Sequence, residues 1–185
     1  MIARDDAMNL LKEHVKEESL LQHSIETEAV MRALARQLGR DEDLWGITGL
    51  LHDIDFEQTK DDAERHGLLA RGILEAVDLP EEAVRAIEAH NGEHNKTPIA
   101  GEFHHALRCG ETITGLVSAA ALVQPDKKLA SVKPKSVRKK FKDKAFARRV
   151  NRDVIRECEQ IGLELPAFIE LSLRAMQDIA DQVGL

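Results

Sequence analysis

The chain has 185 residues, enough for one domain with a substantial core, and its 32% charged residues carry a net charge of −7. Apolar residues make up 43% of the chain but aromatic residues only 3%, and Tyr is absent, so aliphatic side chains must fill the core. Two cysteines without a CxxC motif exclude a disulfide scaffold, and the regular apolar spacing argues against disorder.

Apolar residues recur at helical spacing along most of the chain, and no segment alternates with a period of two. Gly39 is suited to ending a helix, and Pro80 is suited to beginning one. These patterns predict an all-α fold, with helices at about residues 5–15, 19–38, 41–51, 63–77, 81–90, 103–123, 135–144, 152–160 and 166–183.

The sequence has no run approaching the ~20 apolar residues of a membrane span, and its first residues lack the blocks of a signal peptide. Because a reducing compartment also suits the two cysteines, we expect a soluble, cytoplasmic protein with no membrane partner.

The most informative pattern is His52-Asp53, within Gly-Leu-Leu-His-Asp-Ile-Asp at residues 49–55, at the end of an apolar helical stretch. Burying such ionisable groups costs free energy unless they are paired or bound. Neutral imidazole and carboxylate both ligate divalent metals, so this pair is a candidate part of a metal site. His23, His66, His90 and Glu111 are candidate partners elsewhere in the chain.

The order of His23, His52-Asp53 and Glu111 resembles the HD superfamily of metal-dependent phosphohydrolases. The segments at 50–55, 66–74 and 106–116 look like those of the small, single-domain HDIG-type proteins of bacteria and archaea. The resemblance implies one HD-domain-like helical bundle over residues 1–185. Its metal-ligand core would span about 19–123, and basic and C-terminal helices would follow at 127–185.

The resemblance also implies a site built on one or two divalent ions per chain, drawn from Zn, Mn, Fe, Ni, Co and Mg. The implied metal ligands are His23, His52, Asp53 and Glu111, and the implied catalytic residues are Asp53, His66 and His90. His66 and His90 could instead bind a second metal, contact substrate, or serve a structural role.

Two positions depart from the usual pattern of such proteins. Glu111 stands where Asp usually ends the signature, which leaves the metal geometry open. Phe56 stands where several branches have an acid that helps to activate water, with Asp55 and Glu57 as its acidic neighbours.

Positive charge is concentrated in residues 127–152, which hold 12 Lys and Arg against the single acid Asp143. In a phosphohydrolase, Lys133, Lys135 and Arg138 would bind the substrate phosphate, although a solvated basic helix face explains them equally well. Few aromatic residues interrupt the segment, so we do not expect nucleic-acid binding. A homodimer is possible, but no heptad pattern specifies one.

The predicted function is hydrolysis of a nucleotide or another small phosphorylated metabolite by a metal-activated water. Two alternatives remain open at this point. One is a di-iron oxygenase of the HD fold, and the other is a non-catalytic regulatory module that binds metal or nucleotide.

Overall fold

The computed structural model describes residues 1–185 and contains only helices and loops, which confirms the all-α prediction. The α-helices and the short 3-10 helices (η) are α1 (Arg4–His14), α2 (Glu18–Leu38), α3 (Glu42–Leu51), α4 (Phe56–Thr59), α5 (Leu68–Leu74), α6 (Glu81–His90), α7 (Gly92–Asn95), α8 (Gly101–Leu122), η1 (Leu129–Ser131), α9 (Pro134–Lys142), α10 (Arg152–Ile155), η2 (Arg156–Ile161), α11 (Leu165–Gln177) and α12 (Ala180–Val183).

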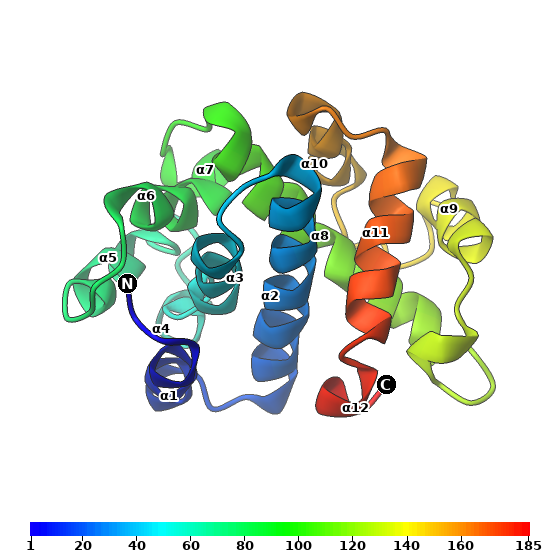
Figure 1. Ribbon diagram of the computed structural model, residues 1–185, viewed down its shortest axis with the longest axis horizontal. Helices are drawn as coiled ribbons and strands as arrows, with labels where there is room; N and C mark the ends of the chain where they lie inside the picture. The colour runs from blue at the N-terminus through cyan, green and yellow to red at the C-terminus, as the bar shows by residue number, and fades with distance from the viewer.

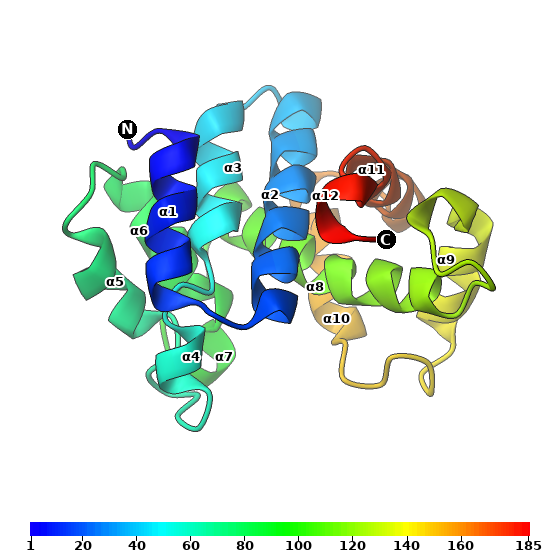
Figure 2. The same cartoon turned by 90° about the horizontal axis from the view of Figure 1, so that it is seen from below.

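Helices α1, α3 and α2 lie side by side as one layer, and the long helix α8 crosses behind them (Figures 1 and 2). Helix α2 also packs against α11, while α6 packs against both α3 and α8. Both views place α5 and α6 at the opposite end of the molecule from α9 (Figures 1 and 2).

Two glycines allow α3 and α8 to approach α2 closely. A Cβ atom at Gly49 of α3 would lie 2.9 Å from Cγ of Met31 and 3.0 Å from the backbone oxygen of Thr27. A Cβ atom at Gly110 of α8 would lie 3.0 Å from Sδ of Met31. His52, three residues after Gly49, and Glu111, directly after Gly110, both lie close to His23 in the N-terminal half of α2.

The apolar face of α2 contributes to one cluster of 40 buried hydrophobic residues that includes side chains from α1 to α12. Leu34, Leu50, Leu107, Leu116 and Phe168 are among its fully buried large side chains. No helix of the structure is both long enough and apolar enough to cross a membrane.

The helix expected at 63–77 is shorter in the structure, because α5 begins only at Leu68. Gly67 before it has φ +86°, a left-handed conformation outside the helical region. The carboxylate of Asp55 accepts hydrogen bonds from the backbone N–H groups of Gly67 and Ala70, at 2.8 and 3.1 Å. A long-range carboxylate therefore fixes the start of this helix.

Candidate metal centre

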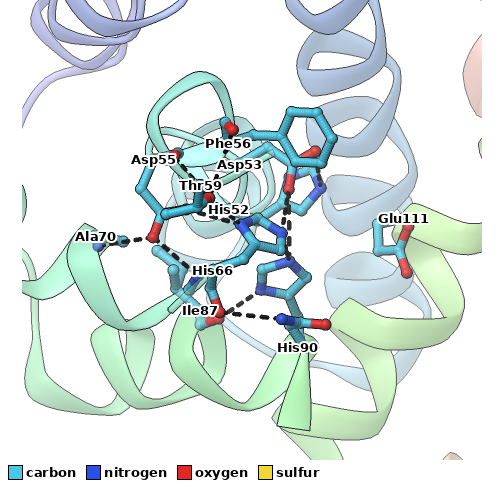
Figure 3. Close-up of polar contacts among 12 residues, drawn as sticks. His52, Asp53, Asp55, Phe56, Thr59, His66, Ala70, Ile87, His90 and Glu111 are labelled. Carbon is cyan, nitrogen blue, oxygen red and sulfur yellow. Dashed lines mark hydrogen bonds and ion pairs between the residues drawn. The ribbon is translucent and has the colours of Figure 1, made fainter. Parts of the chain in front are cut away.

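The candidate metal ligands lie far apart in the sequence, from His23 to Glu111, and come together near the ends of α3 and α6. Figure 3 labels all of them except His23. Asp53 lies directly after the C-cap of α3, and His66 lies in the turn before α5. The full set is His23 on α2, His52 and Asp53 after α3, His66 before α5, His90 at the end of α6 and Glu111 on α8.

Each of the four histidines directs its Nδ1 atom toward a hydrogen-bonding oxygen. His52 and His90 donate to the backbone oxygens of Gly49 and Ile87, at 2.8 and 2.5 Å. A backbone carbonyl only accepts hydrogen bonds, so the proton of each ring is on Nδ1. The lone pair on Nε2 is then available to a metal ion.

In His66 and His23, side-chain oxygens fix the proton on Nδ1. Nδ1 of His66 lies 2.9 Å from Oδ1 of Asp55, a carboxylate oxygen that can only accept a hydrogen bond. Nδ1 of His23 lies 2.9 Å from Oγ1 of Thr114. The Thr114 hydroxyl uses its own proton to donate to the backbone oxygen of Glu111, at 2.7 Å. Thr114 must therefore accept from His23, which leaves Nε2 of His23 with a lone pair. Such partners orient metal-ligating histidines in proteins.

Asp53 lies between two pairs of histidines. Its Oδ2 atom is 3.5 Å from Nε2 of His52 and 3.7 Å from Nε2 of His23. Its Oδ1 atom is 3.2 Å from Nε2 of His66 and 3.4 Å from Nε2 of His90. One carboxylate thus presents a separate oxygen to each pair.

Glu111 completes the set on the His23 side. Its Oε2 atom lies 4.0 Å from Nε2 of His23, and its other oxygen accepts a hydrogen bond from Thr112. Figure 3 shows the side chain leaving α8 in the direction of the histidines. The longer side chain at this position therefore brings a carboxylate to the cluster.

Burial and the Asp53 charge fix the protonation of several ligands. Burial lowers the pKa of His23 and lowers the pKa of His52 to about 3, so both rings are neutral at pH 7. Burial alone would raise the pKa of Asp53, but the neighbouring histidines His52, His66 and His90 outweigh it and lower that pKa well below its ordinary value. Two neutral imidazoles and one carboxylate are the forms that bind metals.

Two other members of the cluster, His66 and Glu111, hold protons when no metal is bound. Burial lowers the pKa of His66, but hydrogen bonds to Asp53 and Asp55 outweigh this and raise it to about 9. Burial raises the pKa of Glu111 to about 8. The Nε2 atoms of His66 and His90 lie only 3.0 Å apart, a spacing that requires a proton or a cation between two lone pairs.

The donor set fits a divalent metal. Two groups of donor atoms, His23 with His52 and Glu111, and His52 with Asp53 and His90, each lie within 4.8 Å of one another. Imidazole nitrogen and carboxylate oxygen bind Zn²⁺ at ~2.0–2.2 Å, so ligands of one ion lie within about 4 Å of each other. The distances from the Asp53 oxygens to the Nε2 atoms of the four histidines, 3.2 to 3.7 Å, are in this range.

The supporting roles of three residues were not predicted from the sequence. Asp55 is fully buried behind His66, and Thr114 is fully buried behind His23. Arg108 is only 2% exposed and donates to the backbone oxygen of His90 at 2.7 Å. Glu57, the other acid near Phe56, instead accepts hydrogen bonds from the backbone N–H groups of Lys16 and Glu17. Neither Asp55 nor Glu57 lines the pocket beside the cluster.

A pocket of about 500 Å³ opens beside the histidines, a size typical of small-molecule sites. Phe56 forms part of its wall and meets the His66 ring edge to face, with ring centres 5.2 Å apart. Arg149, Val150 and Asn151 line it from the loop before α10.

Lys133, Lys135 and Arg138 do not line this pocket. The structure places them around a separate pocket of about 760 Å³, together with Phe141 and Ile169. Their predicted contact with the substrate phosphate is therefore not supported by their placement. The basic segment does reach the histidine pocket, through Arg149.

Comparison with known proteins gives one match. Neither the curated proteins nor the solved structures yield a match to the chain. The model of the HD domain family matches residues 20–143, about two thirds of the sequence. This range includes His23, the His52-Asp53 pair, His66, His90 and Glu111. The chain belongs to the HD domain family.

Proposed function

We propose that the protein is a metal-dependent phosphohydrolase that cleaves a phosphate ester of a nucleotide or another small metabolite. The observation that carries the proposal is the arrangement around Asp53. Four histidines direct their Nε2 atoms toward Asp53, and the two oxygens of Asp53 divide them into His23 with His52 and His66 with His90.

His23, His52, Asp53 and Glu111 would hold one ion, and His66 and His90 would share Asp53 in holding a second. A bound divalent ion lowers the pKa of a coordinated water toward ~7 and polarises a phosphoryl oxygen. The fixed Nδ1 hydrogen bonds prevent the rings from rotating away, so the donor atoms are positioned before substrate arrives.

In the hydrolysis, a water oxygen forms a bond to phosphorus as the phosphorus–oxygen bond to the leaving alcohol breaks. The attacking water loses a proton, and the leaving oxygen gains one. Asp53 is ionised and lies within the pocket, so it can accept the proton from water. A pocket histidine, His66 or His90, can donate a proton to the leaving oxygen when only one ion is bound.

Phe56 leaves its side of the pocket without an acid. An aromatic ring against His66 cannot accept a proton, and it reduces the contact of His66 with water. General-base chemistry in this site therefore rests on Asp53, the ionised carboxylate of the ligand set that lines the pocket.

A di-iron oxygenase is the second candidate, because one carboxylate between two histidine pairs also suits a dinuclear iron site. Iron analysis and spectroscopy distinguish the two. Two iron atoms per chain with a mixed-valent signal would favour the oxygenase, as would oxygen consumption without phosphate release.

The test is release of inorganic phosphate from a panel of phosphate esters by the metal-loaded protein. His52→Ala should abolish release, whereas His14→Ala, a change on α1 outside the pocket, should leave it unchanged. Equal turnover by the His52→Ala protein and the wild type would overturn the proposal. Binding of nucleotide without turnover would instead identify a regulatory module.

A further inference from the structure

The loop between α9 and α10 lies beside the metal ligands, and most of it falls beyond the residues that match the HD domain family. Residues 149–151 of this loop line the histidine pocket. The loop contacts α8 at Gly115, where an added Cβ atom would be 3.2 Å from Cγ2 of Val150. Gly115 lies one helical turn after Glu111, so the loop packs next to this ligand.

The guanidinium of Arg152 holds the loop in shape. Its Nη1 atom donates to the backbone oxygens of Ala147 and Val150, at 2.6 and 2.7 Å. Its Nη2 atom donates to the backbone oxygen of Phe146. Ala147 has φ +44°, a strained conformation for a non-glycine residue that persists only when neighbouring groups enforce it.

The C-terminal end of the loop is fixed separately. Oδ1 of Asn151 accepts hydrogen bonds from the backbone N–H groups of Asp153 and Val154, at 3.0 and 3.4 Å, and so caps α10. The backbone on both sides of Arg149 is therefore constrained, and Arg149 itself lines the pocket.

Two arginines line the pocket, and only one is available to a ligand. Arg108 is buried, and its guanidinium is already shared among Glu157, Glu93 and the backbone oxygen of His90. Arg149 is exposed to solvent and enters into no ion pair or side-chain hydrogen bond. An arginine with five free donors matches the oxygens of a phosphate.

We propose that Arg149 binds the substrate phosphate, that Arg152 positions it through the loop backbone, and that the pocket accepts a single phosphoryl group. The proposal rests on the proposed function and specifies its substrate class. A triphosphate carries three phosphoryl groups and would need several cations, whereas the pocket offers one free guanidinium beside the metal ligands. A phosphomonoester fits this charge.

The first test is binding of inorganic phosphate to the metal-loaded full chain by calorimetry. Arg149→Ala should weaken binding by at least about tenfold, the usual effect of losing a charged hydrogen bond, with unchanged metal content. Arg148→Ala is the matched control, because Arg148 is equally exposed but does not line the pocket. Equal phosphate affinity of the Arg149→Ala protein and the wild type would overturn the proposal.

The second test compares adenosine mono-, di- and triphosphate as substrates. The monophosphate should have the highest kcat/KM, and Arg149→Ala should raise its KM more than it lowers kcat. A preference for the triphosphate would contradict the single-phosphoryl pocket. If the wild type hydrolyses none of them yet binds phosphate through Arg149, the proposed hydrolysis fails and the phosphate site stands.

The positioning role of Arg152 has its own readout in a double-mutant cycle. Arg152→Met should raise KM in the wild type but add little to the effect of Arg149→Ala. Additive effects of the two substitutions on KM would show that Arg152 acts independently of Arg149, and would remove it from the proposal.

Discussion

Asp55 holds His66 by a 2.9 Å hydrogen bond to Nδ1 while its other oxygen accepts two backbone N–H groups at the start of α5. Asp55 is fully buried, and His66 faces Asp53 with its opposite nitrogen. One carboxylate therefore joins the local fold of residues 66–70 to the orientation of a candidate metal ligand.

Replacing Asp55 by Asn should weaken metal binding on the His66 side about 10–100-fold, because the charged partner of Nδ1 is lost. Folding should also be destabilised, by about 1–3 kcal/mol, since a buried polar contact becomes imperfect. Metal titration and thermal unfolding measure the two effects. Asp61→Asn, an exposed change nearby, is the control. Unchanged metal affinity in Asp55→Asn would refute the positioning role.

Thr114→Val should weaken metal binding on the His23 side. The substitution removes the hydroxyl that accepts from Nδ1 of His23 and leaves a buried ring N–H without its partner. We expect a loss of about tenfold in affinity. Zinc competition with a coloured chelator gives the value. An affinity equal to that of the wild type would mean that another group fixes the His23 tautomer.

Metal affinity should increase with pH between about 7 and 9. Without metal, His66 has a pKa of about 9 and Glu111 a pKa of about 8, so both hold protons at pH 7. A metal ion must displace these protons, and raising the pH removes this competition. Calorimetry in two buffers of different ionisation enthalpy counts the protons released. No release at pH 7 would contradict this assignment of protons.

Gly49→Ala should destabilise the fold by about 1–3 kcal/mol, because the new methyl group meets Met31 and the Thr27 backbone at 2.9 and 3.0 Å. Gly72→Ala is a matched control within another helix, where an added Cβ meets no atom within 4 Å. This control should stabilise the protein by up to about 1 kcal/mol. Chemical denaturation measures the free energy of unfolding of the Gly49→Ala and Gly72→Ala proteins and of the wild type. Equal stability of both variants would show that α3 can move away from α2.

The candidate ligand set was predicted from the resemblance to the HD superfamily and from the unusual presence of histidines and carboxylates within apolar helical segments. The ordered positions of His23, His52-Asp53 and Glu111 carried this signal, and the structure brings them together. The helices were predictable for a different reason, because apolar residues recur at regular helical spacing over long segments.

The supporting contacts were not predictable, because they join residues far apart in sequence. The partner of His23 is 91 positions away, and a threonine within an apolar helix carries no signal of such a role. Charge density in the basic segment pointed to Lys133, Lys135 and Arg138. The fold places those residues at another pocket and brings Arg149 to the histidines.

The most direct test of the central claim is the metal content per chain of protein purified without added metal or chelator, with Asp53→Asn prepared in parallel. The amide in this variant would offer one neutral oxygen where the Asp53 carboxylate offers two charged ones between the histidine pairs. We predict one or two equivalents of a divalent metal in the wild type and almost none in the variant. Wild-type metal content in the variant, or none in the wild type even after reconstitution, would contradict a metal centre built around Asp53.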